Sequence, residues 1–149
     1  MTDNDLERFI EAQAEVYDQV TQELRDGKKR SHWMWFVFPQ LKGLGRSPTA
    51  MRFGIVDLEQ AQRYLSDPIL GTRLRECVQL VLDQENATAH DIFGSPDDLK
   101  LRSCLTLFLR AATAKQDADL IQASLDQFLG GKQDELTLNL LAQCKSGTA

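Results

Sequence analysis

The sequence is poor in the residues that build metal sites and disulfide frameworks. Its 149 residues include two histidines and three cysteines, with no Cys-x-x-Cys pair and no Cys/His spacing of a zinc site. Cys77, Cys104 and Cys144 are odd in number and widely separated. We therefore expect no metal, no disulfide framework and no cofactor. We interpret the three cysteines as buried thiols of a protein in the reducing cytoplasm.

Long apolar stretches are also missing. No run approaches the roughly 20 residues of a membrane-spanning helix, so we expect no membrane contact. The N-terminal MTDNDLERF is acidic and amphipathic, which argues against a secretory signal or transit peptide. An isoelectric point near 5.0 argues against non-specific nucleic-acid binding by the whole molecule. Ordinary shares of apolar and charged residues, 42% and 26%, predict one soluble domain over residues 1–149.

One absence is local. No acidic residue occurs between Asp26 and Asp57, a stretch that holds six Lys and Arg residues, both tryptophans and three of the seven phenylalanines. Because the formal charge of the chain is −5, this island of +6 leaves −11 on the remaining residues. Positive charge beside aromatic side chains and a flexible Gly43-x-Gly45 loop is the composition expected of a pocket for an anionic, ring-bearing ligand.

The rest of the chain has helical patterning. Ser, Asp and Thr residues that can cap a helix precede Pro or acidic residues at several positions. Between these caps, apolar residues recur with the 3.6-residue period of a helix. The pattern predicts an all-α fold, a compact single domain of about seven helices in an orthogonal or irregular bundle. The predicted helices are Asp3–Asp26, one beginning at Ser47, Asp57–Leu65, one from Asp67 through Val81, Thr88–Gly94, Ser95–Ala114, Ala118–Leu129 and Glu135–Gln143.

The aromatic segment His32–Phe38 is harder to assign. Its aromatic and β-favouring residues locally resemble a buried strand, but a lone strand would leave its backbone groups unpaired. We therefore predict a short buried helix centred on Trp35 and Phe36 and stopped before Pro39. Trp35→Ala would then cost about 3–5 kcal/mol. For Trp33, a core position and a ligand-stacking position remain open.

The same residues carry a resemblance. HWMWFVFPQLKGLGRS, followed by TAMRFGI, resembles the signature of an uncharacterised bacterial family catalogued as domain of unknown function eighteen-ten. Two later segments, RYLSDPILGTRLREC and IFGSPDDLKLRSCLTLF, are similar to further parts of that family, so the resemblance covers nearly the whole chain. It implies an all-helical domain of about seven helices, with no known activity or catalytic residue. Some relatives are labelled calpastatin, a label that nothing in this sequence supports.

The acid-free segment contains most of the side chains that we assign to a ligand site. Arginine offers a fork of N–H donors that matches phosphate or carboxylate, which makes Arg30 and Arg46 natural partners of an anion. Gly43-x-Gly45 leads into a helix at Ser47, whose free N–H groups favour an anion. The loop lacks the Gly-Lys-Ser/Thr ending of a P-loop and a preceding strand, so a tight turn capped by Ser47 fits the same residues.

Further groups complete the hypothesis. His32 lies between the basic residues and the tryptophans, where it would act as a general acid or base, an oxyanion donor or a structural partner. Lys100 and Arg102 would join the site if the packing brings their helix to the segment. Asp97 and Asp98, just before them, also fit an ordinary first helical turn. The predicted ligand-binding set is Arg30, His32, Trp33, Arg46, Ser47, Lys100 and Arg102, with no catalytic residue and no metal ligand assigned.

Three classes of function fit these observations. The first is a site for a small phosphate-bearing or otherwise anionic, nucleotide-like ligand, with hydrolysis of a nucleoside or ADP-ribose derivative as its catalytic form. The second is a regulatory or adaptor module whose basic and aromatic face binds an acidic protein or a single-stranded nucleic acid. The third is a helical domain without a ligand. A closed pocket would favour the first class, an open patch the second, and burial of both tryptophans the third.

Overall fold

The regular structure of the chain is helical. The computed structural model describes the backbone of residues 5–148 and the side chains of residues 5–143. Its helices are α1 Glu7–Arg25, α2 Met34–Val37, α3 Pro48–Arg52, α4 Leu58–Ser66, α5 Leu70–Leu82, α6 Ala89–Phe93, α7 Asp97–Ala111, α8 Lys115–Leu129 and α9 Glu135–Thr148. The predicted all-α fold is confirmed. The described residues form nine helices rather than about seven, and three of them, α2, α3 and α6, have only four or five residues each.

The predicted capping residues explain where several helices begin. The side chains of Ser47, Asp57 and Thr88 each accept a hydrogen bond from the backbone N–H three residues later, as an N-cap does. Thr88 belongs to a full capping box, since the carboxylate of Asp91 also accepts from the Thr88 N–H. These starts are local events, which is why the sequence predicts them.

Two predicted starts differ from the structure. Asp67 accepts from the N–H groups of Ile69 and Leu70, the latter three residues on as an N-cap does, but a turn follows it and α5 begins only at Leu70. Ser95 does not cap α7, whose N-cap is Pro96 after a cis peptide bond. The predicted cap Asp3 lies outside the described residues.

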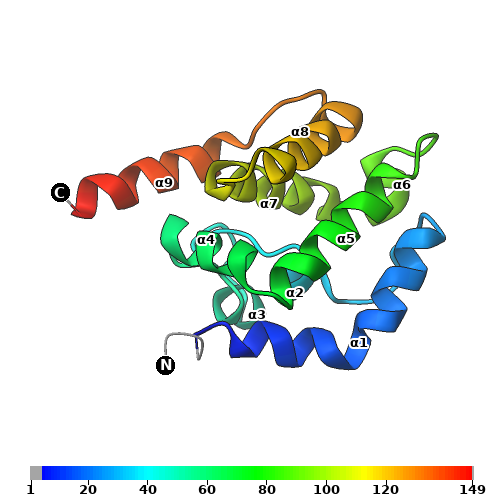
Figure 1. The fold of residues 1–149 in the computed structure, drawn as a ribbon, viewed down its shortest axis with the longest axis horizontal. Coiled ribbons are helices and arrows are strands. Elements are labelled where there is room, and N and C mark those ends of the chain that lie inside the picture. The colour runs from blue at the N-terminus through cyan, green and yellow to red at the C-terminus, as the bar shows by residue number, and fades with distance from the viewer. Residues whose placement is uncertain (1–4, 149) are drawn as a thin grey trace.

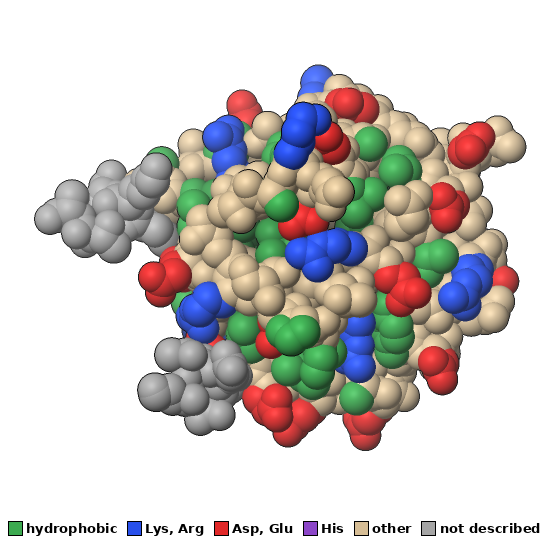
Figure 2. Space-filling view, in the orientation of Figure 1, with side chains coloured by type: hydrophobic (Ala, Val, Ile, Leu, Met, Phe, Trp, Pro, Cys, Tyr) green, Lys and Arg blue, Asp and Glu red, His purple; other side chains and the backbone are tan. Residues whose placement is uncertain are grey.

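The helices form an irregular bundle around α7. This helix contacts α4, α6, α8 and α9, while α5 packs against α1, α4 and α8. Figure 1 shows α1 along one edge of the molecule and α8 and α9 along the opposite edge. On the face shown in Figure 2, basic and acidic side chains are interspersed rather than separated. None of the helices in the described part of the chain, the 19-residue α1 included, is apolar enough over its length to cross a bilayer.

The aromatic segment forms the predicted short helix but buries different residues. α2 ends at Val37, directly before Phe38 and Pro39. Met34 and Val37 are buried because they are three residues apart and share the helix face that meets the core. Trp35 and Phe36 only pack against the edge of the core and are half-buried, so the prediction of a helix centred on them as buried residues was wrong.

The buried tryptophan is Trp33 instead. Its side chain is 1% exposed and packs against Phe38 and Phe93, with ring centroids 6.2 and 6.5 Å away. This burial answers the question that the sequence left open for Trp33. Because Trp35 is only half-buried, the complete burial of both tryptophans that would favour a domain without a ligand is not observed.

Two of the three cysteines are confirmed as buried thiols. Cys77 and Cys104 are both unpaired and fully enclosed. Burial raises the pKa of the Cys77 thiol to about 12 and that of Cys104 well above its usual range, so both stay protonated at neutral pH. The side chain of Cys144 lies outside the described residues.

Because the two tryptophans differ in burial, we expect their truncation to lower the free energy of unfolding by different amounts. Trp33→Ala should lower the free energy of unfolding by about 3–5 kcal/mol, because it empties a fully buried aromatic site. Trp35→Ala should cost about half as much, since part of its ring is already in water. Denaturant unfolding of both variants measures the two losses, and equal losses would contradict the difference in burial.

Candidate functional site

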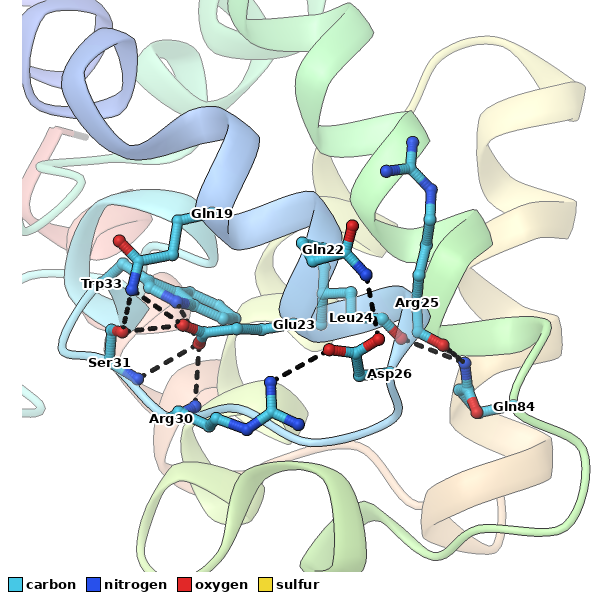
Figure 3. Close-up of polar contacts among 10 residues, drawn as sticks. All are labelled: Gln19, Gln22, Glu23, Leu24, Arg25, Asp26, Arg30, Ser31, Trp33 and Gln84. Atoms are coloured by element: carbon cyan, nitrogen blue, oxygen red, sulfur yellow. Dashed lines mark hydrogen bonds and ion pairs between the residues drawn. The ribbon is translucent and has the colours of Figure 1, made fainter.

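A buried carboxylate, Glu23 of α1, organises the start of the acid-free segment (Figure 3). Its Oε1 accepts from the backbone N–H groups of Arg30 and Ser31, at 2.8 and 3.1 Å. The same oxygen accepts from the indole Nε1–H of Trp33 at 2.9 Å. Its Oε2 accepts from the Ser31 hydroxyl at 2.7 Å and from the Gln19 amide at 3.1 Å. Five donors from four residues surround one carboxylate, and we call this group the Glu23 network.

The Glu23 network supplies the acid that the segment lacks. Glu23 is 3% exposed, and burial alone would raise the pKa of its carboxyl. The hydrogen bonds from Arg30, Ser31 and Trp33 outweigh burial and lower this pKa from its ordinary 4.5 to about 2. The carboxylate is therefore ionised at neutral pH and fixes the path of the chain between α1 and α2.

Two lysines meet at the start of α7. Lys29 Nζ lies 2.9 Å from Oδ2 of Asp97, and Lys100 Nζ lies 3.3 Å from Oδ1 of the same carboxylate. Lys29 also stands 5.1 Å from the ring centroid of Trp33, and Lys100 stands 5.1 Å from that of Trp35. These distances suit cation–π interactions. Because one carboxylate serves two ammonium groups, the cluster carries a formal charge of +1.

Only half of this cluster faces solvent. The side chain of Lys29 is 8% exposed and lies over the buried Trp33, whereas that of Lys100 is 26% exposed and lies over the half-buried Trp35. We call the solvent-facing half, Trp35 and Lys100 with the groove beside them, the Trp35 surface. At this surface Lys100 of α7 contacts the aromatic segment, as the sequence analysis expected if the packing brings the two together.

The groove beside Trp35 is shallow. Its volume is about 10 Å³, and its lining consists of Trp35, Gln40, Leu41, Gly45, Ala50, Phe53 and Gly54. Ligand pockets for small molecules usually measure roughly 300–1,000 Å³. A ligand at this place would therefore lie on the surface rather than inside a closed pocket.

The Gly-x-Gly loop has a structural reason for each glycine. Gly43 has a φ of +107°, a conformation that other residues rarely adopt. A Cβ added to Gly45 would lie 2.7 Å from the Cβ of Ala50, so only glycine fits against α3. The loop is closed by backbone hydrogen bonds between residues 40–42 and Ile55.

The structure separates Arg30 from the segment that follows Arg46. Arg30 pairs with Asp26 just beyond the last turn of α1, at 3.0 Å. The segment that follows Arg46 lies at the other end of that helix, because Arg8 in the first turn donates to the carbonyls of Arg52 and Gly54 (Figure 1). A 19-residue helix is about 28 Å long, so Arg30 and the α3 segment lie at opposite ends of α1.

The other residues of the predicted set differ in their exposure to solvent and in their contacts. His32 and Arg46 are exposed, and Arg46 directly follows Gly45 in the groove. The Ser47 hydroxyl is occupied as the N-cap of α3, where it accepts from the Ala50 N–H. Trp33 is enclosed by the core and has no ring face to offer a ligand in solution.

Lys100 and Arg102 face different sides of α7. Two positions on a helix are separated by about 200°, so the side chains diverge. Lys100 reaches Trp35, whereas Arg102 lines a hollow beside the loop between α8 and α9. The structure therefore brings Lys100, and not Arg102, to the aromatic segment.

The predicted ligand-binding set leaves out three residues: Glu23 of the Glu23 network, and Lys29 and Asp97 of the lysine cluster. Glu23 lies seven residues before Arg30, and nothing in its position along the sequence indicates that its carboxylate is buried. Lys29 and Asp97 pair across 68 positions of the chain, and only their opposite charges signal the contact. Among the described residues, no three His, Cys, Asp or Glu side chains are grouped so that they could hold a metal ion.

Comparisons with known proteins identify the class. A family model described as "Protein of unknown function (DUF1810)" matches residues 3–141, so the chain belongs to this family, and the resemblance seen in the sequence is confirmed. The crystal structure of the conserved hypothetical protein Rv1873 from Mycobacterium tuberculosis is similar, with 55% identity and a TM-score of 0.88. The similarity covers 93% of this chain and 96% of that one. No curated protein matches.

The lowered pKa of Glu23 predicts a specific dependence on pH. A carboxyl whose folded pKa is about 2 stabilises the fold fully above its ordinary 4.5, and this contribution is lost as the pH falls toward 2. Glu23→Gln should therefore unfold more easily than the wild type at pH 7, by up to roughly 3 kcal/mol. This difference should shrink between pH 5 and about pH 2.

Denaturant unfolding at a series of pH values measures the difference. Glu15→Gln is the matched control, because Glu15 lies on the exposed side of the same helix. It should change stability little at any pH. A penalty for Glu23→Gln that stays constant down to pH 2 would contradict the role of the Glu23 network.

Proposed function

We propose that the Trp35 surface binds a small anionic ligand that carries a planar ring. The observation that supports this most directly is the position of Lys100, 5.1 Å from the centroid of a half-buried tryptophan. An ammonium group held over one face of a half-buried indole complements an acidic group, and the part of the indole that Lys100 leaves open complements a ring on the same molecule. A nucleotide or a similar phosphate-bearing compound has this combination.

The charge of the cluster supports an anion. Lys29 and Lys100 share the carboxylate of Asp97, which holds both ammonium groups in place and leaves one positive charge without a partner of its own. Lys100 is the more exposed of the two, so the anionic group of the ligand would lie on its side. Arg46 is exposed and directly follows Gly45 of the groove lining, so it would supply a second cation.

The geometry supports binding better than hydrolysis. Both oxygens of Asp97 are engaged by ammonium groups, so they are poorly placed to take a proton from water. His32, the other candidate, is exposed and lies next to Trp33 rather than beside Trp35. We assign no catalytic residue.

The small volume of the groove favours a second candidate. A surface with room for about one water molecule in its deepest part also suits an extended partner, such as a single-stranded nucleic acid or an acidic protein segment. The same tryptophan and lysine would then contact one unit of a longer chain.

Tryptophan fluorescence and thermal unfolding test the proposal. The probes are AMP, adenosine, inorganic phosphate, a short single-stranded oligonucleotide and a poly-glutamate peptide. A cognate ligand at one hundred times its dissociation constant should add about 2.7 kcal/mol and raise the melting temperature by roughly 5–11 °C. It should also change the emission of Trp35 while leaving Trp33 unaffected, so that Trp35→Phe removes the signal.

Matched variants locate the site. Lys100→Met and Arg46→Ala should weaken binding, whereas Arg30→Ala, a change at another exposed arginine at the far end of α1, should not. Preference for AMP over the polymers supports the first candidate, and preference for a polymer supports the second. No response to any probe, or equal losses for Arg30→Ala and Arg46→Ala, would contradict a ligand site at the Trp35 surface.

A further inference from the structure

Three basic side chains gather where the start of α1 meets the end of α3 (Figure 1). Arg8, in the first turn of α1, donates from Nε to the Arg52 carbonyl at 2.7 Å and from Nη2 to the Gly54 carbonyl at 3.3 Å. The stem of Lys42 packs across the same glycine, since a Cβ added to Gly54 would lie 2.7 Å from the Cβ of Lys42. The fold thus joins cations from α1, from α3 and from the loop before α3, although 44 positions separate Arg8 from Arg52.

Buried aromatic rings hold the two arginines side by side. The guanidinium carbon of Arg8 lies 4.5 Å from the ring centroid of Phe9, and that of Arg52 lies 5.3 Å from the centroid of Phe53. The two rings are in contact, with centroids 5.7 Å apart. Burial lowers the pKa of Arg8, the charge of Asp5 raises it and the charge of Arg52 lowers it again. An anion bound beside the two arginines would relieve their repulsion.

The acids close to these cations in the sequence are engaged elsewhere. The carboxylate of Asp5 pairs with Arg63 at 2.8 Å, and Arg8 donates only to the backbone carbonyl of Asp5. The carboxylate of Asp57 caps α4 and accepts from the Gln60 N–H at 2.8 Å. Within residues 5–143, none of the three cations forms an ion pair. Their charge is therefore available to an acidic partner.

Exposed apolar side chains border the same place. Met51 of α3 is 52% exposed, and Val56, two residues beyond Gly54, is 47% exposed. Single exposed apolar residues are common on protein surfaces, but methionine beside arginine is typical of protein interfaces. Phe9 and Phe53 are buried beneath the arginines, so they offer no ring face on which a nucleic-acid base could stack. This combination favours a protein partner over a nucleic acid.

We propose that Arg8, Lys42, Met51, Arg52 and Val56, which we call the α3 surface, bind an acidic segment of a partner protein that also carries an aliphatic side chain. The carboxylates of this segment pair with Lys42 and Arg52, whose side chains are exposed and make no hydrogen bond within the described residues. The aliphatic side chain covers Met51 and Val56. The α3 surface borders the groove at Gly54 but contains neither Trp35 nor Lys100, so it does not depend on the ligand proposed for the Trp35 surface.

Fluorescence anisotropy of a labelled peptide tests the kind of partner. Acetyl-Glu-Glu-Leu-Leu-Glu-Glu-amide should bind, and its affinity should fall as the salt concentration rises, because salt screens ion pairs at a surface. The counterpart with Gln in place of Glu should bind roughly tenfold more weakly, and the counterpart with Ser in place of Leu should also lose affinity. No binding of the acidic peptide, equal affinity of the Gln counterpart, or tighter binding of an oligothymidylate of the same charge would overturn the proposal.

Variants locate the peptide on the α3 surface. Lys42→Gln and Arg52→Gln should each weaken binding roughly threefold, and together about tenfold, with little change in melting temperature because both side chains are exposed. Arg25→Gln, the same change at an exposed arginine in the last turn of α1, is the matched control and should keep full affinity. Equal losses for Arg25→Gln and Arg52→Gln would contradict the assignment. If Lys100→Met loses as much affinity as the double variant, the peptide lies on the Trp35 surface and the proposal is wrong.

Discussion

The carboxylate of Glu23 is the contact on which the candidate site depends. It accepts five hydrogen bonds, and four of them come from the segment that has no acidic residue of its own. A basic loop without an internal counter-ion would otherwise extend into water. The buried acid of α1 turns this loop back over the helix end and holds the indole of Trp33 in the core. The position of α2 follows, because it begins at the next residue.

From there a chain of contacts leads to the surface. The loop also carries Lys29, which pairs with Asp97 at the start of α7, and Asp97 in turn holds Lys100 over Trp35. Although the whole chain has a net charge of −5, the acids that contact this segment, Glu23 and Asp97, come from other helices. At Trp35 itself, the positive charge that reaches solvent is that of Lys100, and the proposed ligand site follows from this contact. The α3 surface is independent of this chain of contacts, because its cations meet at the other end of α1.

The sequence predicts what is local and misses what depends on distant partners. The caps at Ser47, Asp57 and Thr88 and the all-α fold are read correctly, since a cap needs only the next three residues. Which tryptophan is buried depends on Glu23, ten residues earlier, and on Phe93, sixty residues later. The distance between Arg30 and Arg46 depends on where α1 ends relative to α3, which no spacing reveals. The divergence of Lys100 and Arg102, in contrast, could be predicted from the sequence, because side chains two residues apart on a helix point to different sides.

Hydrogen exchange at the two tryptophan indole N–H groups, followed by NMR, tests the central role of Glu23 most directly. The two tryptophans are two positions apart in one segment, and they differ in burial and in hydrogen-bond partner. The Trp33 indole proton should exchange roughly a hundredfold or more slowly than that of Trp35, because it is buried and bonded to the Glu23 carboxylate. Glu23→Gln should bring the two rates closer together. Exchange of the Trp33 proton as fast as that of Trp35 in the wild type would contradict the account.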